Sequence, residues 1–277
     1  MKNVILALFL SILISHAYTQ DVHVASYNIR LQTEKDTGNL WDDRKYALCQ
    51  VIKFHEFDIF GIQEAFDNQM QDIQSLLPYY NHIGVGRDDG KKRGEHSAIF
   101  YNPSRFELIR EGTFWLSEKT TATPNKGWDA ALPRICTWGV FKDLQNGRSF
   151  IFMNTHFDHK GKIAREESAK LILTKAHTLA TGLPIILTGD FNADEKSQAY
   201  STLANSGIVK DTYTLAPLVY EPNSTFNGWG QSIKDKSRID HIFVSSAFTV
   251  KKYGVLTDTY RGKYPSDHFP VTSIIRW

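Results

Sequence analysis

Cysteine and methionine are scarce in this sequence, whose 277 residues include two cysteines and three methionines. Two cysteines exclude a disulfide-rich scaffold and a zinc motif built from paired thiols. A single disulfide between Cys49 and Cys136 stays open in an exported protein. However, Cys49 falls on an apolar helical stripe and Cys136 directly precedes a strand-like run. We therefore expect two free, buried thiols.

Long apolar runs and an excess of one charge are also missing. After residue 17, no stretch approaches the roughly 18 apolar residues of a transmembrane helix, so we expect no transmembrane segment. The net charge of +2 argues against a general polyanion-binding surface. The basic segment GRDDGKKRGEH carries its own acidic residues and is interpreted as a solvated loop. Nucleic acid stays open as a partner, but the charge does not indicate it.

The first residues, MKNVILALFLSILISHA, contain an early lysine, an apolar run and a small-residue ending. The run of about 11 residues is too short to span a bilayer, and its ending fits a cleavage site. We predict a signal peptide over residues 1–17 and a secreted or periplasmic protein. The alternative is an uncleaved anchor or a core segment. Residues 18–277 show no linker or repeat, and we expect one monomeric domain there.

Hydrophobic periodicity predicts a mixture of strands and helices. Several strand-like runs follow one another directly, and Asn146-Gly147 is a strong hairpin signal between two of them. This order disfavours a pure parallel βαβ repeat and predicts sheets packed face to face with helices outside. The predicted strands cover residues 22–28, 57–64, 96–102, 106–116, 137–143, 149–156, 183–190, 238–245, 248–256 and 270–277, and the helices cover 42–56, 67–77, 163–180 and 196–207.

Polar side chains stand at the ends of many of these strands. Each has an ordinary explanation on its own, such as a turn, a helix cap or a hydrogen-bonded buried histidine. Together they would be costly to bury unpaired, at several kcal/mol per ion. A bound cation and pairing between histidine and aspartate would offset that cost. The residues are Asn28, Glu64, His156, Asp190, Asp240, Asp267 and His268.

Three of these residues, Asn28, Glu64 and Asp267, are candidate ligands that would all bind a metal through oxygen. Hard oxygen sites suit Mg²⁺, Mn²⁺ or Ca²⁺. Magnesium typically binds through one or two carboxylates together with water and substrate phosphate. A multinuclear zinc site would need more closely spaced histidines, and the HExxH motif is absent.

Seven motifs then carry a family resemblance, in the order SYNIR, IFGIQEA, EHSAIFYN, NTHFDH, LTGDFNA, RIDHIF and PSDHFPV. Together they resemble the endonuclease/exonuclease/phosphatase superfamily over nearly all of the mature chain. Residues 114–138, with KGWDAALPR, look closest to a secreted bacterial branch. The resemblance implies a DNase I-like α/β fold, a four-layer α/β/β/α sandwich of two mixed sheets with helices outside. It also implies Mg²⁺- or Mn²⁺-dependent cleavage of phosphoesters.

The resemblance assigns roles at one edge of the sheets. It implies that Asn28, Glu64 and Asp267 hold the metal. Asp190 would orient and deprotonate the attacking water, and Asn192 would donate to a phosphoryl oxygen. Both residues stand in the segment LTGDFNA.

Histidines and an arginine complete the implied site. His268 would touch the phosphate, with its other nitrogen held by Asp240, a pairing that favours imidazolium. His156 matches the histidine that assists the leaving group in nuclease-like members. Arg134 could supply a bidentate phosphate clamp, and His96 aligns with a position that often contacts phosphate. Surface or structural roles stay open for the last two.

Some positions depart from the pattern or are weaker candidates. Arg30 stands where some DNA-repair members carry a carboxylate, which puts a second metal ligand there in doubt. Asp158 is expected to hydrogen-bond near the site, His159 is a weaker candidate, and Asp194 is predicted to cap a helix. Tryptophans could stack on a base or sugar, although core packing explains each equally well; they are Trp115, Trp128, Trp138 and Trp229.

The sequence therefore predicts a secreted metal-dependent phosphoesterase that hydrolyses a phosphodiester or phosphomonoester with an activated water. The phosphorylated substrate stays open among nucleic acid, a phospholipid headgroup, an inositol phosphate and another metabolite. The alternatives are a nuclease acting on DNA or RNA, and a non-catalytic binding module on the same scaffold. A binding module has no need for the full set of acidic, amide and histidine residues.

Overall fold

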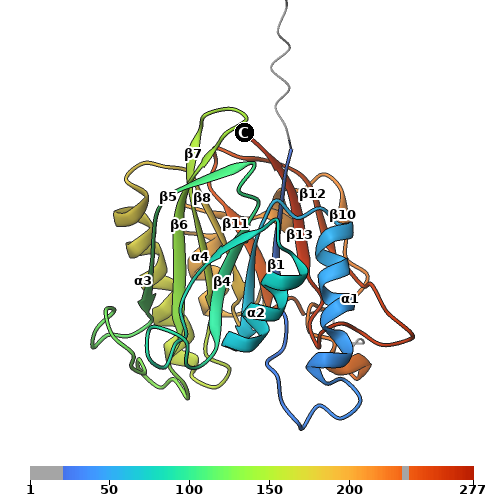
Figure 1. Cartoon of the computed structure of the whole chain (residues 1–277). Helices are drawn as coiled ribbons and strands as arrows, with labels where there is room; N and C mark the ends of the chain where they lie inside the picture. The colour runs from blue at the N-terminus through green and yellow to red at the C-terminus, as the bar shows by residue number, and fades with distance from the viewer. Residues whose placement is uncertain (1–20, 233–236) are drawn as a thin grey trace, which may run out of the picture.

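The computed structural model describes residues 21–232 and 237–277 as two β-sheets that pack face to face (Figure 1). The predicted signal peptide lies outside the described residues. Within the described residues, no helix is both long enough and apolar enough to cross a membrane. The free thiols of Cys49 and Cys136 are buried, as expected.

One sheet has seven strands in the order β10-β12-β13-β1-β2-β4-β3. The second has six strands in the order β5-β6-β7-β8-β11-β9. Both sheets mix parallel and antiparallel neighbours. The strands are β1 (Val22–Asn28), β2 (Ile59–Ala65), β3 (Asn81–Ile83), β4 (His96–Tyr101), β5 (Phe106–Trp115), β6 (Ile135–Asp143), β7 (Ser149–His156), β8 (Ile185–Asp190), β9 (Lys210–Asp211), β10 (Val219–Tyr220), β11 (Asp240–Val244), β12 (Thr249–Val255) and β13 (Val271–Arg276).

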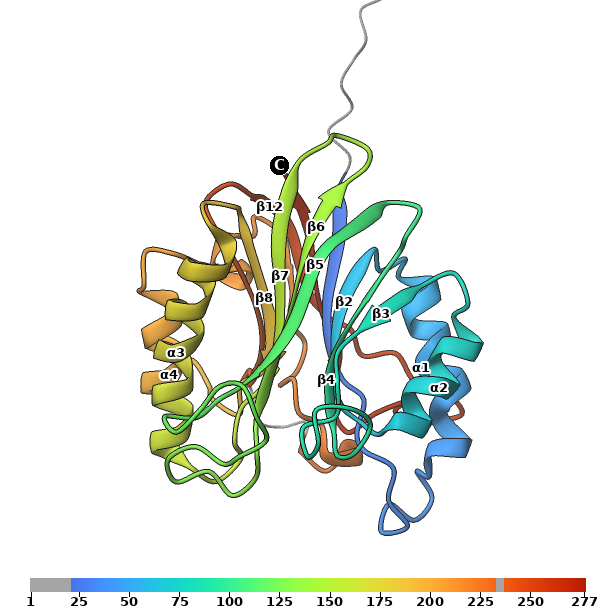
Figure 2. The ribbon, with the colours of Figure 1, turned by 60° about the vertical axis from the view of Figure 1, so that its left-hand side comes forward.

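Helices cover the outer face of each sheet, so the molecule has four layers (Figure 2). Helices α1 (Trp41–Phe54) and α2 (Asp67–Leu76) cover the seven-stranded sheet, and α3 (Lys162–Ala180) and α4 (Gln198–Ala204) cover the six-stranded one. A short helix α5 (Thr212–Leu215) and a 3₁₀ turn (Gly228–Gly230) complete the list. Three apolar cores lie between these layers. The α/β/β/α sandwich predicted from the sequence is confirmed.

Local sequence signals explain the positions of these helices, with one exception. The apolar stripe of α1 buries Leu48, Cys49 and Ile52 against the sheet. Helix α4 begins at a cap, but the capping residue is Ser197, whose hydroxyl accepts from the Tyr200 N–H at 3.1 Å. The cap predicted at Asp194 was wrong, because that side chain accepts from the Lys196 N–H in the preceding turn.

The strand pairing brings the predicted polar strand ends to one edge. Strand β1 is parallel to β2, with Asn28 opposite Gln63, and β7 is parallel to β8, with His156 opposite Asp190. Because parallel neighbours end at the same edge of a sheet, their last side chains lie together. Strand β11 runs antiparallel to β8, so its first residue, Asp240, pairs with Asp190.

A buried polar contact joins the two sheets beneath this edge. The Gln63 side chain donates to the Asn154 carboxamide oxygen at 2.7 Å, and Thr188 donates to the same oxygen at 3.0 Å. Asn154 in turn donates to the carbonyls of Ile62 and Ala98. A side chain at Gly61 would collide with Asn154, so glycine permits this close approach. These hydrogen bonds thus fix the position of one sheet relative to the other at this edge.

Candidate active site

A cavity of about 420 Å³ opens at this shared edge. Its lining takes residues from both sheets and from the loops between them. Seven of the ten residues proposed from the sequence line it: Glu64, Arg134, His156, Asp190, Asn192, Asp267 and His268. Asn28 and Asp240 lie directly behind the lining, where they hydrogen-bond to Asp190 and His268.

Asn28 joins the carboxylates supplied by the two sheets. Its side-chain nitrogen donates to Glu64 at 3.0 Å and to Asp190 at 2.9 Å. Its side-chain oxygen accepts from the Arg30 N–H at 3.0 Å. The residue is fully buried. Asn28 therefore fixes the spacing of two acids, and its oxygen, proposed as a metal ligand, already receives one backbone donor.

Asp190 stands at the centre of the site. One carboxylate oxygen lies 3.4 Å from His156 Nε2 and 3.8 Å from His268 Nε2, and the other accepts from the Asn192 N–H at 2.9 Å. Burial raises the pKa of Asp190 to about 7, the negative charge of Asp240 adds to this, and His268 opposes it. A carboxylate with a pKa near neutral pH is suited to exchange a proton with a bound water.

The two histidines at Asp190 are held in opposite charge states. His268 Nδ1 lies 2.9 Å from Asp240. Burial opposes its charging, but Asp240 and Asp190 outweigh burial and raise the pKa of His268 to about 10. Burial and the charge of Arg134 hold the pKa of His156 well below its usual range. The site thus offers one imidazolium and one neutral imidazole at neutral pH.

Asn192 fixes the proton on His156. The Asn192 side-chain nitrogen contacts His156 Nε2 at 3.1 Å and also donates to the Phe157 carbonyl at 3.1 Å. Because an amide nitrogen only donates, His156 Nε2 accepts and its proton sits on Nδ1. That Nδ1 lies 3.7 Å from a Glu95 oxygen.

Three residues that line the cavity, Arg30, Glu64 and Asn192, have left-handed φ angles. Backbone strain of this kind clusters at functional sites.

Glu95 is a lining residue that the sequence analysis missed. It forms a two-pronged pair with Arg87 at 2.6 and 2.7 Å, and it is nearly buried. Burial raises the pKa of Glu95 to about 7, Arg87 opposes this, and the charge of Glu64 adds to it. Glu95 directly precedes the strand HSAIFY. The strand-end pattern that identified the other residues would have identified this one too.

His96, its neighbour, does not join the site. Successive residues at the start of a strand face opposite sides. Glu95 takes the side that lines the cavity, while His96 Nδ1 contacts the Ala65 carbonyl at 3.0 Å outside the lining. The predicted phosphate contact of His96 is therefore corrected. The four tryptophans proposed as stacking platforms are also outside the lining, and the aromatic side chain in it is Phe226.

Arg134 lines the cavity, but most of its guanidinium is engaged. Its Nε lies 3.4 Å from Asp158 and its Nη2 donates to His159 Nδ1 at 3.0 Å. Nη1 has no hydrogen-bond partner among the described residues. One nitrogen is left for a ligand, rather than the two that a bidentate phosphate clamp uses.

Arg30 lies between two of the predicted metal ligands. Its guanidinium is 4.0 Å from Glu64 and 3.7 Å from Asp267, and Asp36 holds it with contacts of 2.8 and 3.0 Å. Burial raises the pKa of Asp267, whereas the hydrogen bond from Asn28 and the charge of His268 overcome burial and lower that of Glu64. The residue that departs from the family pattern thus supplies positive charge beside these acids.

The donor chemistry of the cavity fits a hard divalent cation. Two groups bring their ligand atoms within 4.8 Å of one another, namely Glu64 with His156 and Asp190, and Asp190 with Asp240 and His268. Asp267 belongs to neither group. Oδ1 of Asp240 is buried and has no hydrogen-bond partner in residues 21–232 and 237–277. Carboxylate oxygens in this number suit Mg²⁺ or Mn²⁺.

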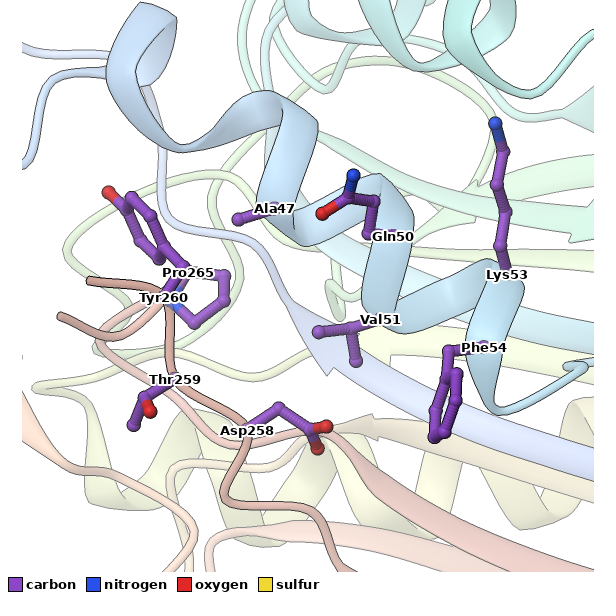
Figure 3. Close-up of a pocket in the computed structure, with 9 residues that line it drawn as sticks. All are labelled: Ala47, Gln50, Val51, Lys53, Phe54, Asp258, Thr259, Tyr260 and Pro265. Carbon is purple, nitrogen blue, oxygen red and sulfur yellow. The ribbon is translucent and has the colours of Figure 1, made fainter. Parts of the chain in front are cut away.

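A second cavity, of about 560 Å³, lies between α1 and the segment before β13 (Figure 3). Val51 and Phe54 of the helix face Asp258, Tyr260 and Pro265 across it. Both groups of potential cation ligands in the described part of the chain belong to the first cavity. The chemistry is therefore located at the sheet edge.

A four-layer sandwich with acidic residues and histidines gathered at one edge of its sheets is the architecture of DNase I-like hydrolases. The chain belongs to the Endonuclease/Exonuclease/phosphatase family, whose sequence pattern matches residues 25–268. Members of this family are hydrolases that act on phosphoesters, and they typically use a divalent metal. The fold and the family that the sequence suggested are therefore confirmed.

Solved structures of family members superpose closely on this chain. A mannosyl-6-phosphatase of Bacteroides thetaiotaomicron is 49% identical, with a TM-score of 0.90 over 92% of this chain and 100% of that one. A family protein of Bacteroides vulgatus is 40% identical, with a TM-score of 0.89 over 93% and 99%. Nocturnin of Xenopus laevis is 25% identical over 82% of this chain, which spans 63% of the Nocturnin length.

Proposed function

We propose that this protein is a divalent-metal-dependent phosphatase that hydrolyses a phosphate monoester of a sugar. The observation that carries the proposal is the contact set of Asp190, a buried acid within 4 Å of His156 and His268 and bonded to Asn28. A water positioned by such a group loses its proton as it attacks phosphorus. The likeness to a mannosyl-6-phosphatase at 49% identity supports the sugar monoester.

The metal would be held by Glu64 and Asp267, with Asn28 setting the position of Glu64. When bound, Mg²⁺ or Mn²⁺ neutralises charge on the phosphoryl oxygens. Arg30 adds a fixed positive charge at the same acids. Arg30 is one cation beside three carboxylates, Asp36, Glu64 and Asp267, and this excess of negative charge supports a metal at Glu64 and Asp267.

The chain's own residues supply the remaining chemistry. Asp190 accepts the proton of the attacking water. Protonated His268, held by Asp240, donates from Nε2 to a phosphoryl oxygen. Both N–H groups of the Asn192 amide go to His156 Nε2 and the Phe157 carbonyl, so Asn192 orients His156 rather than donating to the phosphate. The Nδ1–H of His156 is left to hydrogen-bond the leaving group. Each of these donors is fixed in place before substrate arrives, which lowers the cost of organising the site.

A substrate panel tests the proposal. We expect hydrolysis of mannose 6-phosphate and p-nitrophenyl phosphate with Mg²⁺ or Mn²⁺, and its loss in EDTA with recovery on adding metal. Bis-p-nitrophenyl phosphate, sphingomyelin, plasmid DNA and RNA should be poor substrates. Hydrolysis of the nucleic acids with no activity on either monoester would overturn the proposal in favour of a nuclease. Absence of all hydrolysis, with phosphate esters bound, would favour a binding module.

We also propose that the protein is exported by a bacterium after cleavage of residues 1–17. The support is the early lysine, the short apolar run and the small residues at its end. Expression of the full chain in a bacterium, with mass spectrometry of the exported product, tests this. The mature N-terminus should be Tyr18 or a residue just beyond it, and a product retained with Met1 in the cytoplasm would contradict the proposal.

A further inference from the structure

One wall of the cavity is a series of side chains in contact that starts at the catalytic acid. The contacts run from Asp190 to His156 at 3.4 Å, from His156 to Glu95 at 3.7 Å, and from Glu95 to Arg134 at 3.9 Å. Arg134 then contacts His159 at 3.0 Å. All five side chains line the cavity. Arg134 and His159 therefore end this series, and no hydrogen bond or ion pair among the described residues joins either of them to Asp190.

Each arginine of this wall already has a carboxyl partner. Arg87 pairs with Glu95, and Arg134 pairs with Asp158. Neither guanidinium is therefore left as a free cation to attract an anion. A wall of this kind is suited to uncharged groups that both donate and accept hydrogen bonds.

Unused donors nevertheless remain on it. Nη1 of Arg134 is buried and has no hydrogen-bond partner in the part of the chain that the structure describes. Because the guanidinium only donates, His159 Nδ1 must accept from Arg134, and the neutral His159 ring carries its proton on Nε2. His159 is exposed at the cavity. The nearest Glu95 oxygen is 3.9 Å from Nη1, too far for a hydrogen bond. A buried donor without a hydrogen bond costs free energy, which a ligand oxygen would recover.

The wall is also rigid before any ligand binds. Asp158 accepts the backbone N–H groups of Leu132, Lys160 and Gly161 at 3.2, 3.0 and 2.7 Å. Burial opposes ionisation, but these bonds and Arg134 hold the pKa of Asp158 below its usual range. Asp158 therefore ties the loop that carries Arg134 to the loop that carries His159, and it fixes the spacing of their donors.

We propose that Arg134 and His159 form a subsite for the hydroxyl groups of the substrate's leaving group. The proposal rests on the phosphatase function, and it names the part of the substrate that the enzyme selects. A sugar phosphate presents adjacent hydroxyls beyond its phosphorus, and these meet the Arg134 Nη1 and His159 Nε2 donors. An aryl phosphate presents none. The two residues thus set specificity while Asp190 and its neighbours perform the reaction.

The test compares mannose 6-phosphate with p-nitrophenyl phosphate, both with Mg²⁺. His159→Phe keeps a ring of similar size and removes both nitrogens. We expect the ratio of kcat/KM, sugar over aryl phosphate, to fall about tenfold, the effect of losing roughly one hydrogen bond. The change should appear chiefly as a higher KM for the sugar phosphate. His159→Gln, which restores a donor, should recover part of the ratio.

His177→Phe is the matched control, because His177 is an exposed histidine in the last turn of α3, outside this cavity. It should leave the ratio unchanged, and thermal denaturation should show every variant folded. An unchanged ratio in His159→Phe, or an equal loss on both substrates, would overturn the subsite while leaving the phosphatase intact. A wild-type protein that hydrolyses neither monoester with any metal would overturn the proposed function, and the subsite with it.

Discussion

Arg238 and Asp240 lie two residues apart in the chain, yet they belong to two buried charged clusters of opposite character. In the site cluster, made of Glu64, Asp190, Asp240, Asp267 and His268, burial and mutual repulsion raise the pKa of Asp190 to about 7. In the second group, the Arg238 cluster, the same low-dielectric surroundings produce the opposite result.

The Arg238 cluster consists of Arg238, Asp211, Glu195, Glu221 and His241. The arginine contacts Asp211 at 2.9 Å, Glu195 at 2.8 Å and Glu221 at 3.5 Å. Burial would raise the pKa of Asp211, but His241 and Arg238 outweigh burial and lower it to about 2. All three acids of this cluster contact the same arginine, and its two glutamates are partly exposed to water, which lowers the cost of their charges. The cluster therefore holds strands β9 and β11 and their loops together.

The comparison separates structural charge from functional charge. A cluster whose acids are paired gains stability from ionisation, whereas a cluster with surplus acids loses it. The surplus of acids in the site cluster is meaningful because a divalent cation would offset it. We expect mutations in the two clusters to differ in kind: one set should remove activity and the other should remove stability.

The largest expected effect is on catalysis. Asp190→Asn should lower kcat for p-nitrophenyl phosphate by roughly 10²- to 10⁴-fold, the usual contribution of a general base. Its free energy of unfolding should not fall, because an unfavourable buried charge is removed. Steady-state kinetics and urea denaturation measure the two quantities. Asp194→Asn, in the same loop, is the control, and full activity in Asp190→Asn would contradict the assignment.

Arg238→Met should have the reverse profile. Removing the arginine leaves Asp211 and two glutamates without their shared partner, and we expect a loss of about 3–5 kcal/mol in the free energy of unfolding. Urea denaturation measures it. Arg276→Met, which breaks a half-exposed pair with Asp21, should cost less than about 1 kcal/mol. Equal losses in the two variants would show that the Arg238 cluster is no more than a surface network.

Metal binding should sharpen the contrast without any turnover. Mg²⁺ at 100 times its dissociation constant is expected to stabilise the folded protein by roughly 2.7 kcal/mol, seen as a higher Tm. Glu64→Gln should lose most of this shift, because it removes a charged ligand. Arg238→Met should have a lower Tm without metal, but Mg²⁺ should raise that Tm by the same amount as in the wild type. An unchanged response in Glu64→Gln would show that Glu64 does not hold the metal.

The smallest effects are on pH dependence, measured in EDTA by urea denaturation. Asp190 has a raised pKa, so its contribution to stability is present below about pH 4, its ordinary value, and is lost as pH rises through about 7. The Asp211 contribution is present above about pH 4 and is lost as pH falls through about 2. Asp190→Asn should therefore remove the pH dependence of stability between about pH 4 and 7, and Asp211→Asn that between about pH 2 and 4. A change in the same pH range for both variants would contradict the comparison of the two clusters.

Much of the site could be predicted because it rests on strand periodicity. Asn28, Glu64, His156 and Asp190 end apolar strands, and parallel pairing brings such ends together. Thus most of the predicted residues meet at one cavity. The prediction for His96 was wrong because neighbouring residues of a strand face opposite sides. Glu95, one residue earlier, faces the cavity instead.

The remaining features depend on loops, whose contacts the pattern does not encode. Arg134 was expected to offer two free nitrogens, but Asp158 and His159, more than twenty residues later, occupy most of its guanidinium. Arg30 lies beside Glu64 and Asp267, which are far apart in the chain. Such long-range pairings depend on loop conformation, so periodicity does not specify them.

The site is divided between the two sheets: β1 and β2 carry Asn28 and Glu64, while β7 and β8 carry His156 and Asp190. The hydrogen bond from Asn28 to Asp190 crosses that division and joins residues 162 positions apart. Neither sheet alone therefore holds more than half of these four groups. Under the proposed function, hydrolysis would require both sheets to be packed together, so turnover would report complete folding.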